Sequence, residues 1–253
     1  MKKDSPIVKR LTLAVSVIFW LAVWQIAAMA LDKEILLVAP IAVVKRLSEL
    51  VVTAPFWQAV VTSFVRILIG FGAALVIGIL LAAASAFSPI KALLAPPMAA
   101  IRAVPVASFI ILVLIWFSSE HLSSVISFLM VLPVIYSNTL GGISSIDRDL
   151  DEMADVFELR GLRRLRCLWL AQIMPSLLTG CEISLGLCWK SGIAAEVIGM
   201  PDHTIGEALQ QAKVYLDTPD LFAWTVVIVV VSTLFAKLFM VTAKAVTRLL
   251  TRT

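Results

Sequence analysis

Long, uninterrupted apolar runs constrain the fold of this chain more than any other feature. Residues 11–31, "LTLAVSVIFWLAVWQIAAMAL", and 67–87, "ILIGFGAALVIGILLAAASAF", contain no charged side chain. A helix needs about 20 mostly apolar residues to cross a bilayer, and both runs are that long. Of the 253 residues, 60% are hydrophobic and 15% are charged, whereas about a quarter are charged in a soluble domain. We therefore predict an all-α, polytopic membrane protein.

Four further segments bring the number of predicted transmembrane helices to six. They are residues 103–118 (extending back through Met98), 122–142, 176–198 and 221–243. Pro133 is expected to kink the helix that contains it. We expect residues 1–60 to hold the first helix and an external amphipathic segment, and residues 61–253 to form a five-helix core.

The distribution of Lys and Arg orients these helices, because cytoplasmic segments carry an excess of basic residues. If the N-terminus is cytoplasmic, the external segments hold Lys33, Lys45, Arg46 and Lys213, with Arg66 at the outer start of the second span. Both termini are then cytoplasmic. The N-terminal run also resembles a signal peptide, with "AMA" at 28–30. A signal peptide's apolar region is usually about 7–15 residues, and this run is longer, so we favour an uncleaved helix.

Residues 42–54, "AVVKRLSELVVTA", are too short and too charged to span the membrane. Five apolar residues are expected on one face of a helix: Val43, Val44, Leu47, Leu50 and Val51. Two interpretations are open: an amphipathic helix lying on the outer membrane surface, or an external connector packed on the rest of the protein.

Sequence motifs for catalysis and for binding of nucleotides or metals are absent. The chain has no "GxxxxGK[ST]" phosphate loop, no "HExxH" and no "GxSxG". Its three cysteines have no metal-ligand spacing, and we interpret them as small core residues. We predict a transporter, a channel or a membrane scaffold that is not an enzyme, binds no cofactor or metal of its own, and has no nucleic-acid partner.

One charged segment, "DLDEMADVFELRG" at 149–161, lies between two apolar runs on the predicted cytoplasmic side. Asp149 and Glu152 have the spacing of a capping box, and Gly161 is a typical helix stop. The sequence predicts a short helix over 149–160. Met153, Val156 and Phe157 form an apolar strip on it, which either packs on the protein's own helices or enters a groove on a partner.

This segment resembles the cytoplasmic EAA loop of the permease subunits of bacterial ATP-binding-cassette (ABC) importers. Glu152 and Ala154 match the first and third positions of that motif, and Met153 replaces its second. Glu158 stands at the position of the first Gly, which follows here as Gly161, and Ala171 stands where the family has Pro, which follows as Pro175.

The resemblance extends to "TSFVRILIGF" (62–71), "RAVPVASFIILVLIWF" (102–117) and residues 188–227. These segments are similar to importer permeases of the nitrate, sulfonate and taurine type. The resemblance implies the type I importer permease fold in a bacterial inner membrane and inward transport of a small, anionic solute by alternating access.

The resemblance also implies the partners. They are a second copy of the permease, two copies of a separate ATPase that binds ATP and Mg²⁺, and an extracytoplasmic substrate-binding protein. The residues expected to contact the ATPase are those of the loop: Asp151, Glu152, Met153, Ala154, Val156, Phe157, Arg160 and Gly161.

Ionisable residues within the fifth predicted span are the remaining candidates for function. A charge at mid-bilayer is costly and usually faces protein or a water-filled path. Lys190 and Glu196 could line the path of an anionic substrate, or Lys190 could form an ion pair with Glu196 or Glu182. The alternative function is an ion-coupled secondary transporter that uses Lys190, Glu182 and Glu196 as coupling groups. A membrane scaffold whose loop recruits a soluble protein is a third hypothesis.

Overall fold

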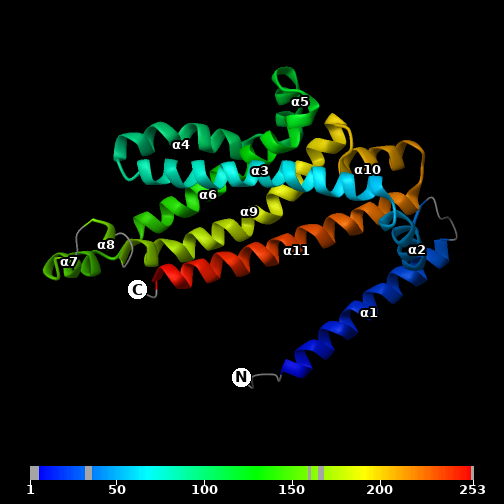
Figure 1. Ribbon diagram of the computed structural model, residues 1–253, viewed down its shortest axis with the longest axis horizontal. Coiled ribbons are helices and arrows are strands. Elements are labelled where there is room, and N and C mark those ends of the chain that lie inside the picture. The colour runs from blue at the N-terminus through cyan, green and yellow to red at the C-terminus, as the bar shows by residue number, and fades with distance from the viewer. Residues whose placement is uncertain (1–5, 32–35, 159–160, 165–167, 252–253) are drawn as a thin grey trace.

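Every element in the described part of the chain is a helix, as predicted (Figure 1). The computed structural model describes residues 6–31, 36–158, 161–164 and 168–251. The helices are α1 (Pro6–Leu31), α2 (Pro40–Val51), α3 (Ala54–Ala84), α4 (Ser88–Ala103), α5 (Val106–Trp116), α6 (Ser119–Ser144), α7 (Arg148–Val156), α8 (Leu162–Arg164), α9 (Leu170–Gly199), α10 (Ile205–Val214) and α11 (Thr218–Thr251).

Within the described ranges, four helices are long and apolar enough to cross a membrane: α3, α6, α9 and α11. α6, α9 and α11 contain the predicted spans 122–142, 176–198 and 221–243 and extend beyond both ends of each. α3 starts before the predicted span 67–87 and ends within it, at Ala84. The first predicted span, 11–31, lies within α1, whose described apolar part, Val15–Leu31, is shorter than a full span. Its crossing of the membrane therefore stays a prediction.

The predicted span 103–118 is not one straight helix. The chain bends by 107° between α4 and α5, and the two together make a fifth candidate span. The break falls at Val104 and Pro105, since Pro105 has no N–H to donate to the preceding turn and disfavours helical geometry at Val104. Pro133, in contrast, sits inside α6 without interrupting it.

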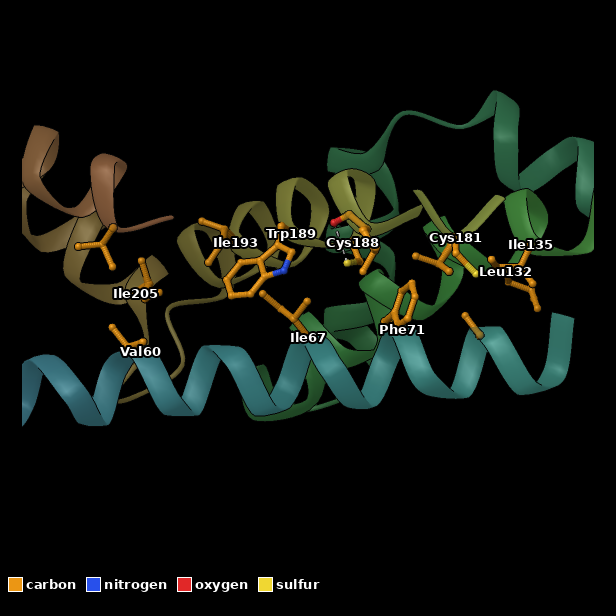
Figure 2. Packing of buried hydrophobic residues seen from close by; sticks show 14 of the residues in the cluster. Val60, Ile67, Phe71, Leu132, Ile135, Cys181, Cys188, Trp189, Ile193 and Ile205 are labelled. Atoms are coloured by element: carbon orange, nitrogen blue, oxygen red, sulfur yellow. Dashed lines mark hydrogen bonds between the residues drawn. The ribbon is translucent and has the colours of Figure 1, made fainter. Parts of the chain in front are cut away.

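The core lies where α3, α6 and α9 pack against one another (Figure 2). Ile67 and Phe71 of α3 lie beside Trp189 and Cys188 of α9, and all four side chains are buried. Gly70 permits the close approach of α3 to α6, because a Cβ there would lie 2.3 Å from the carbonyl oxygen of Ser124. Small residues of this kind allow membrane helices to pack closely.

The external segment forms α2, which starts with Pro40 at a position where proline suits a helix. Val43 is buried and packs in a small cluster with Val38 and Ala223. Arg46 forms an ion pair with Asp220 of α11 at 2.5 Å, and this raises the pKa of its guanidinium. α2 therefore packs on the protein through Val43, whereas Val44, predicted on the same face, is 66% exposed. The placement of α2 on the outer membrane surface stays a prediction.

The short helices α2, α7, α8 and α10 lie at the two ends of the bundle (Figure 1). α7 and α8 project from the end at which α6 stops and α9 begins, while α2 and α10 lie at the other end. α11 runs between the two ends and finishes near α8.

Candidate functional site

α7 begins at Arg148, one residue earlier than predicted, and its cap lies two residues before the predicted cap. The side chain of Asp147 accepts a hydrogen bond from the Asp149 N–H at 2.9 Å, so Asp147, not Asp149, caps the helix. The Asp147 N–H in turn donates to Oε1 of Gln172 at 2.8 Å. The predicted capping box at Asp149 was wrong because this long-range contact with α9 fixes the chain at Asp147.

The predicted end of this helix at Gly161 is also wrong. α7 ends at Val156, and Phe157 caps it. Glu158 adopts a left-handed conformation with φ of +53°, an arrangement that ends helices and that glycine usually supplies. Gly161 has a positive φ as well. Arg160 lies outside the described residues.

The apolar residues between Met153 and Phe157 divide between two environments. Ala154 is 2% exposed and faces the protein, whereas Met153 is 50%, Val156 81% and Phe157 68% exposed. The small side chain therefore supplies the contact with the protein's own body. The three large ones, together with exposed Glu152, are left uncovered at the end of the bundle.

Arg164, the last residue of α8, binds back to the side chains of α7. Its Nε donates to Oδ1 of Asp151 at 2.9 Å, its Nη2 lies 2.7 Å from Oδ2 of the same carboxylate, and its Nη1 donates to Asp155. Trp169 Nε1 also donates to Asp151 Oδ1 at 2.9 Å. The guanidinium carbon lies 5.9 Å from the centre of the Trp169 ring. Arg164 thus joins the helix to the start of α9.

These contacts shift the acid–base properties of the pair. The hydrogen bond from Trp169, and after it those from Arg164, lower the pKa of Asp151 below its ordinary 3.8. The carboxylates of Asp151 and Asp155, which accept hydrogen bonds from Arg164, raise the pKa of its guanidinium. Both groups are therefore charged at neutral pH. Sequence analysis had missed Arg164, because no local spacing connects it to Asp151.

Glu196, a predicted path residue, is fully buried. Its Oε2 accepts hydrogen bonds from Ser63 Oγ of α3 at 2.7 Å and from the Gly206 N–H of α10 at 3.3 Å. Ser63 Oγ also accepts from the Ile205 N–H at 2.9 Å. This carboxylate joins three helices, and its surroundings are those of a structural group.

Lys190 and Glu182 are both exposed on α9. Among the ion pairs formed by described residues, none joins Lys190 to Glu182 or to Glu196. The three candidate coupling groups of the secondary-transporter hypothesis are therefore not gathered into one site within this chain.

Arg102 is a second residue that sequence analysis did not single out. It is the last residue but one of α4, and its Nη2 donates to the carbonyl oxygen of Pro133 in α6 at 2.5 Å. The available signal was one cation between the apolar stretches "APPMAAI" and "AVPVASF".

Metal-binding geometry is missing from the part of the chain that the structure describes. There, no three His, Cys, Asp or Glu side chains are arranged to hold a metal ion. Cys181 and Cys188 are free and buried in the core, as predicted for small core residues, while Cys167 lies outside the described residues.

Comparison with known proteins places these features in context. The sequence model of the family "binding-protein-dependent transport system inner membrane component" matches residues 74–252. The putative aliphatic sulfonates transport permease protein SsuC of Escherichia coli is 33% identical, over 90% of this chain and 86% of its own. The taurine transport system permease protein TauC of the same organism is 28% identical (87% and 82%). The putative SsuC of Bacillus subtilis is 27% identical (85% and 78%).

Proposed function

We propose, from the premise that this chain belongs to the family of inner membrane components of binding-protein-dependent transport systems, that it imports a sulfonate-like anion. Its role is that of the permease subunit of an ATP-driven importer. The relatives carry names of permeases for aliphatic sulfonates and taurine, and this supports a small sulfonate as the substrate class.

The observation that carries the proposal is the uncovered apolar end of α7. Val156 and Phe157 are exposed on a helix that Asp147 and Arg164 tie firmly to α9. A helix that only closed a loop would not need to be both anchored and exposed. Apolar side chains presented on a rigid helix are what a groove on a partner protein binds. We propose that the groove belongs to a separate ATPase.

We further propose the assembly and its cycle. Two copies of the chain form a homodimer, and each α7 sits in one of two ATPase subunits, which bind ATP and Mg²⁺. ATP binding closes the ATPase pair and draws the two α7 helices together, so the pore opens outward to a substrate-binding protein. Hydrolysis returns it inward. Rigid-body rocking of packed helices is a common form of such transitions.

The proposed orientation places both termini and α7 in the cytoplasm. The basic residues described around α7, Arg163 and Arg164, support this side, because inside segments are enriched in Lys and Arg. α2 and α10, at the other end of the bundle, then face the substrate-binding protein.

The docking proposal is tested by co-purifying the permease with its ATPase. We expect Val156→Asp combined with Phe157→Asp to weaken the complex by about 30-fold or more, as loss of a central apolar anchor does. The matched control is Val52→Asp combined with Val214→Asp, which places the same charges on exposed apolar positions at the other end. An ATPase that stays bound to the first variant would refute the docking site.

The transport proposal is tested in proteoliposomes that contain the permease, the ATPase and the binding protein. Uptake of taurine or an alkanesulfonate should require ATP on the side of the membrane that the ATPase faces. It should continue when the proton gradient is collapsed. Uptake that persists without the ATPase and stops when the gradient collapses would establish the ion-coupled alternative instead.

A further inference from the structure

Arg102 lies level with the middle of the candidate spanning helix α6. α4 starts at Ser88, and at 1.5 Å per residue Arg102 is about 20 Å along its axis, within a hydrocarbon core about 30 Å thick. Its hydrogen-bond partner, the carbonyl of Pro133, also lies near the middle of the spanning helix α6. A charged residue at this depth is costly, and it usually faces a water-filled cavity or a charged partner.

Arg102 borders a cavity and has no anionic partner among the residues that the structure describes. Its side chain makes one hydrogen bond among the contacts of the described residues, to Pro133, and the residue is exposed overall. A guanidinium has five N–H donors, so most of its donors remain available. An Arg with free donors recognises planar or tetrahedral oxyanions through paired hydrogen bonds.

Two hollows of about 360 Å³ each meet at Arg102 between α4 and α6. One extends past Pro105 to Leu187 of α9, and the other extends along α4 to Lys91. Together they form what we call the α4–α6 groove. Its size is within the range of small-molecule sites, about 300–1,000 Å³.

The charge of the α4–α6 groove has one sign. Among the described residues that line it, the charged side chains are Lys91 and Arg102, and the other polar groups include the hydroxyls of Ser137 and Ser144. Lys91 stands near the start of α4 and Arg102 near its end. The groove therefore presents one cation close to the cytoplasmic end of the bundle and a second at mid-depth.

We propose that the α4–α6 groove is a binding site for a small oxyanion of the sulfonate class, with Arg102 as the residue that binds the anion and Lys91 as a weaker, second contact. The proposal rests on the proposed function for its substrate class. It places the anion at Arg102, not at Lys190, which lines neither hollow.

The binding test uses the permease–ATPase complex in nanodiscs of phosphatidylcholine alone, without the binding protein. A ligand that binds the folded state raises the melting temperature with its concentration. Ethanesulfonate should raise it at constant ionic strength, and the neutral ethanesulfonamide should not. Arg102→Gln should weaken the response to ethanesulfonate by about tenfold or more, and Lys91→Gln by about two- to threefold. Lys237→Gln, an exposed cation of α11 outside the groove, should leave it unchanged.

Two further measurements cover the cases in which Arg102→Gln cannot be purified and in which the groove binds a lipid. If Arg102→Gln cannot be purified, Arg102→Lys retains the charge but loses the paired geometry, and it should bind at least about fivefold more weakly; equal affinity would overturn the proposal. A second set of nanodiscs contains phosphatidylglycerol. If that lipid stabilises the wild type but not Arg102→Gln, while ethanesulfonate has no effect in either disc, the groove binds a lipid headgroup and the proposal is wrong.

The binding result and the transport result can fail separately. Absence of ATP-driven sulfonate uptake by the complete wild-type transporter refutes the proposed substrate, whatever the nanodiscs show. In the other case, the wild-type transporter takes up the sulfonate, but Arg102→Gln responds to ethanesulfonate as strongly as the wild type does. That result refutes the binding site in the α4–α6 groove and leaves the proposed function standing.

Discussion

α7 and α10 are both short, capped helices in the loops between spanning helices, yet they are held in different ways. The side chain of Thr204 accepts from the Glu207 N–H at the start of α10, as Asp147 accepts from the Asp149 N–H at the start of α7. Beyond its cap, α10 buries Ile205 and Ala212 against the bundle.

Among the side chains of α7 that the structure describes, only the small Ala154 is buried, and the helix is held mainly by the charges of Arg164, Asp151 and Asp155. Packing fixes α10 as part of the body of the protein. Polar contacts at two points fix the position of α7 while leaving its large apolar side chains uncovered. A helix that must meet a partner needs the second arrangement, because burial would consume the same surface.

The variant with the largest expected effect tests the packing of α10 by adding a methyl group where α10 contacts α9. A Cβ added at Gly206 would lie 2.2 Å from Glu196 Cβ and 2.6 Å from the Val197 nitrogen. Because α9 backbone cannot move aside, we expect Gly206→Ala to destabilise the permease by about 3 kcal/mol or more, measured by thermal unfolding in detergent. Gly186→Ala, where an added Cβ meets nothing within 4 Å, should leave the melting temperature within a few degrees of the wild type or raise it.

A smaller loss of stability should follow from removing the hydroxyl that joins three helices. Ser63→Ala leaves the Ile205 N–H without its partner and removes a hydrogen bond to Glu196. Leaving a buried polar group unpaired costs about 1–3 kcal/mol, and denaturant unfolding would measure it. Ser48→Ala, at an exposed position, is the control. Equal stability of both variants would mean that polar contacts contribute little to holding α10.

For α7 we expect the opposite result: a variant that loses its polar contacts should stay folded, but ATP hydrolysis should no longer drive transport efficiently. Arg164→Gln removes the contacts to Asp151 and Asp155, so α7 loses its fixed position relative to α9. Coupling between distant sites typically changes affinity by about 5- to 150-fold. We expect transported solute per ATP hydrolysed to fall by about fivefold or more, with the melting temperature nearly unchanged. Arg163→Gln, at the exposed neighbouring position, should transport normally.

The smallest expected effect is that of pH on the attachment of α7. Because the folded state lowers the pKa of Asp151 below 3.8, its contribution is complete above that pH and is lost only as the pH falls through the lowered pKa. Fluorescence of Trp169, read in a variant that keeps this Trp alone, should therefore be constant between about pH 5 and pH 8. A transition within that range would show that another group controls the helix.

The sequence predicted the elements whose signal is local. Runs of apolar residues identified the helices α3, α6, α9 and α11, and "VVKRLSELV" identified α2. The features that it did not predict depend on contacts between distant segments. The cap moved to Asp147 because of Gln172, twenty-five residues on, and nothing near Glu196 in the sequence indicates that it binds Ser63.

The candidate site shows the same division. The EAA-like motif indicated which residues form α7, but not that Glu158 would end the helix in a left-handed conformation. The break at Pro105 has a local cause that the apolar pattern concealed, since residues on both sides of it are equally hydrophobic. Arg102 gained meaning only when the structure placed it between two hollows.

The length of α11 ties the protein to the thickness of its membrane. Its 34 residues extend about 50 Å, more than the roughly 40–45 Å of a bilayer with its headgroups, so the helix must lean or protrude. In a bilayer with shorter acyl chains, a long apolar helix tilts further from the membrane normal. α9 packs along α11 and is joined to α7 through Gln172, so the lean of the bundle carries α7 sideways. In the proposed dimer, a change in this lean would change the distance between the two α7 helices.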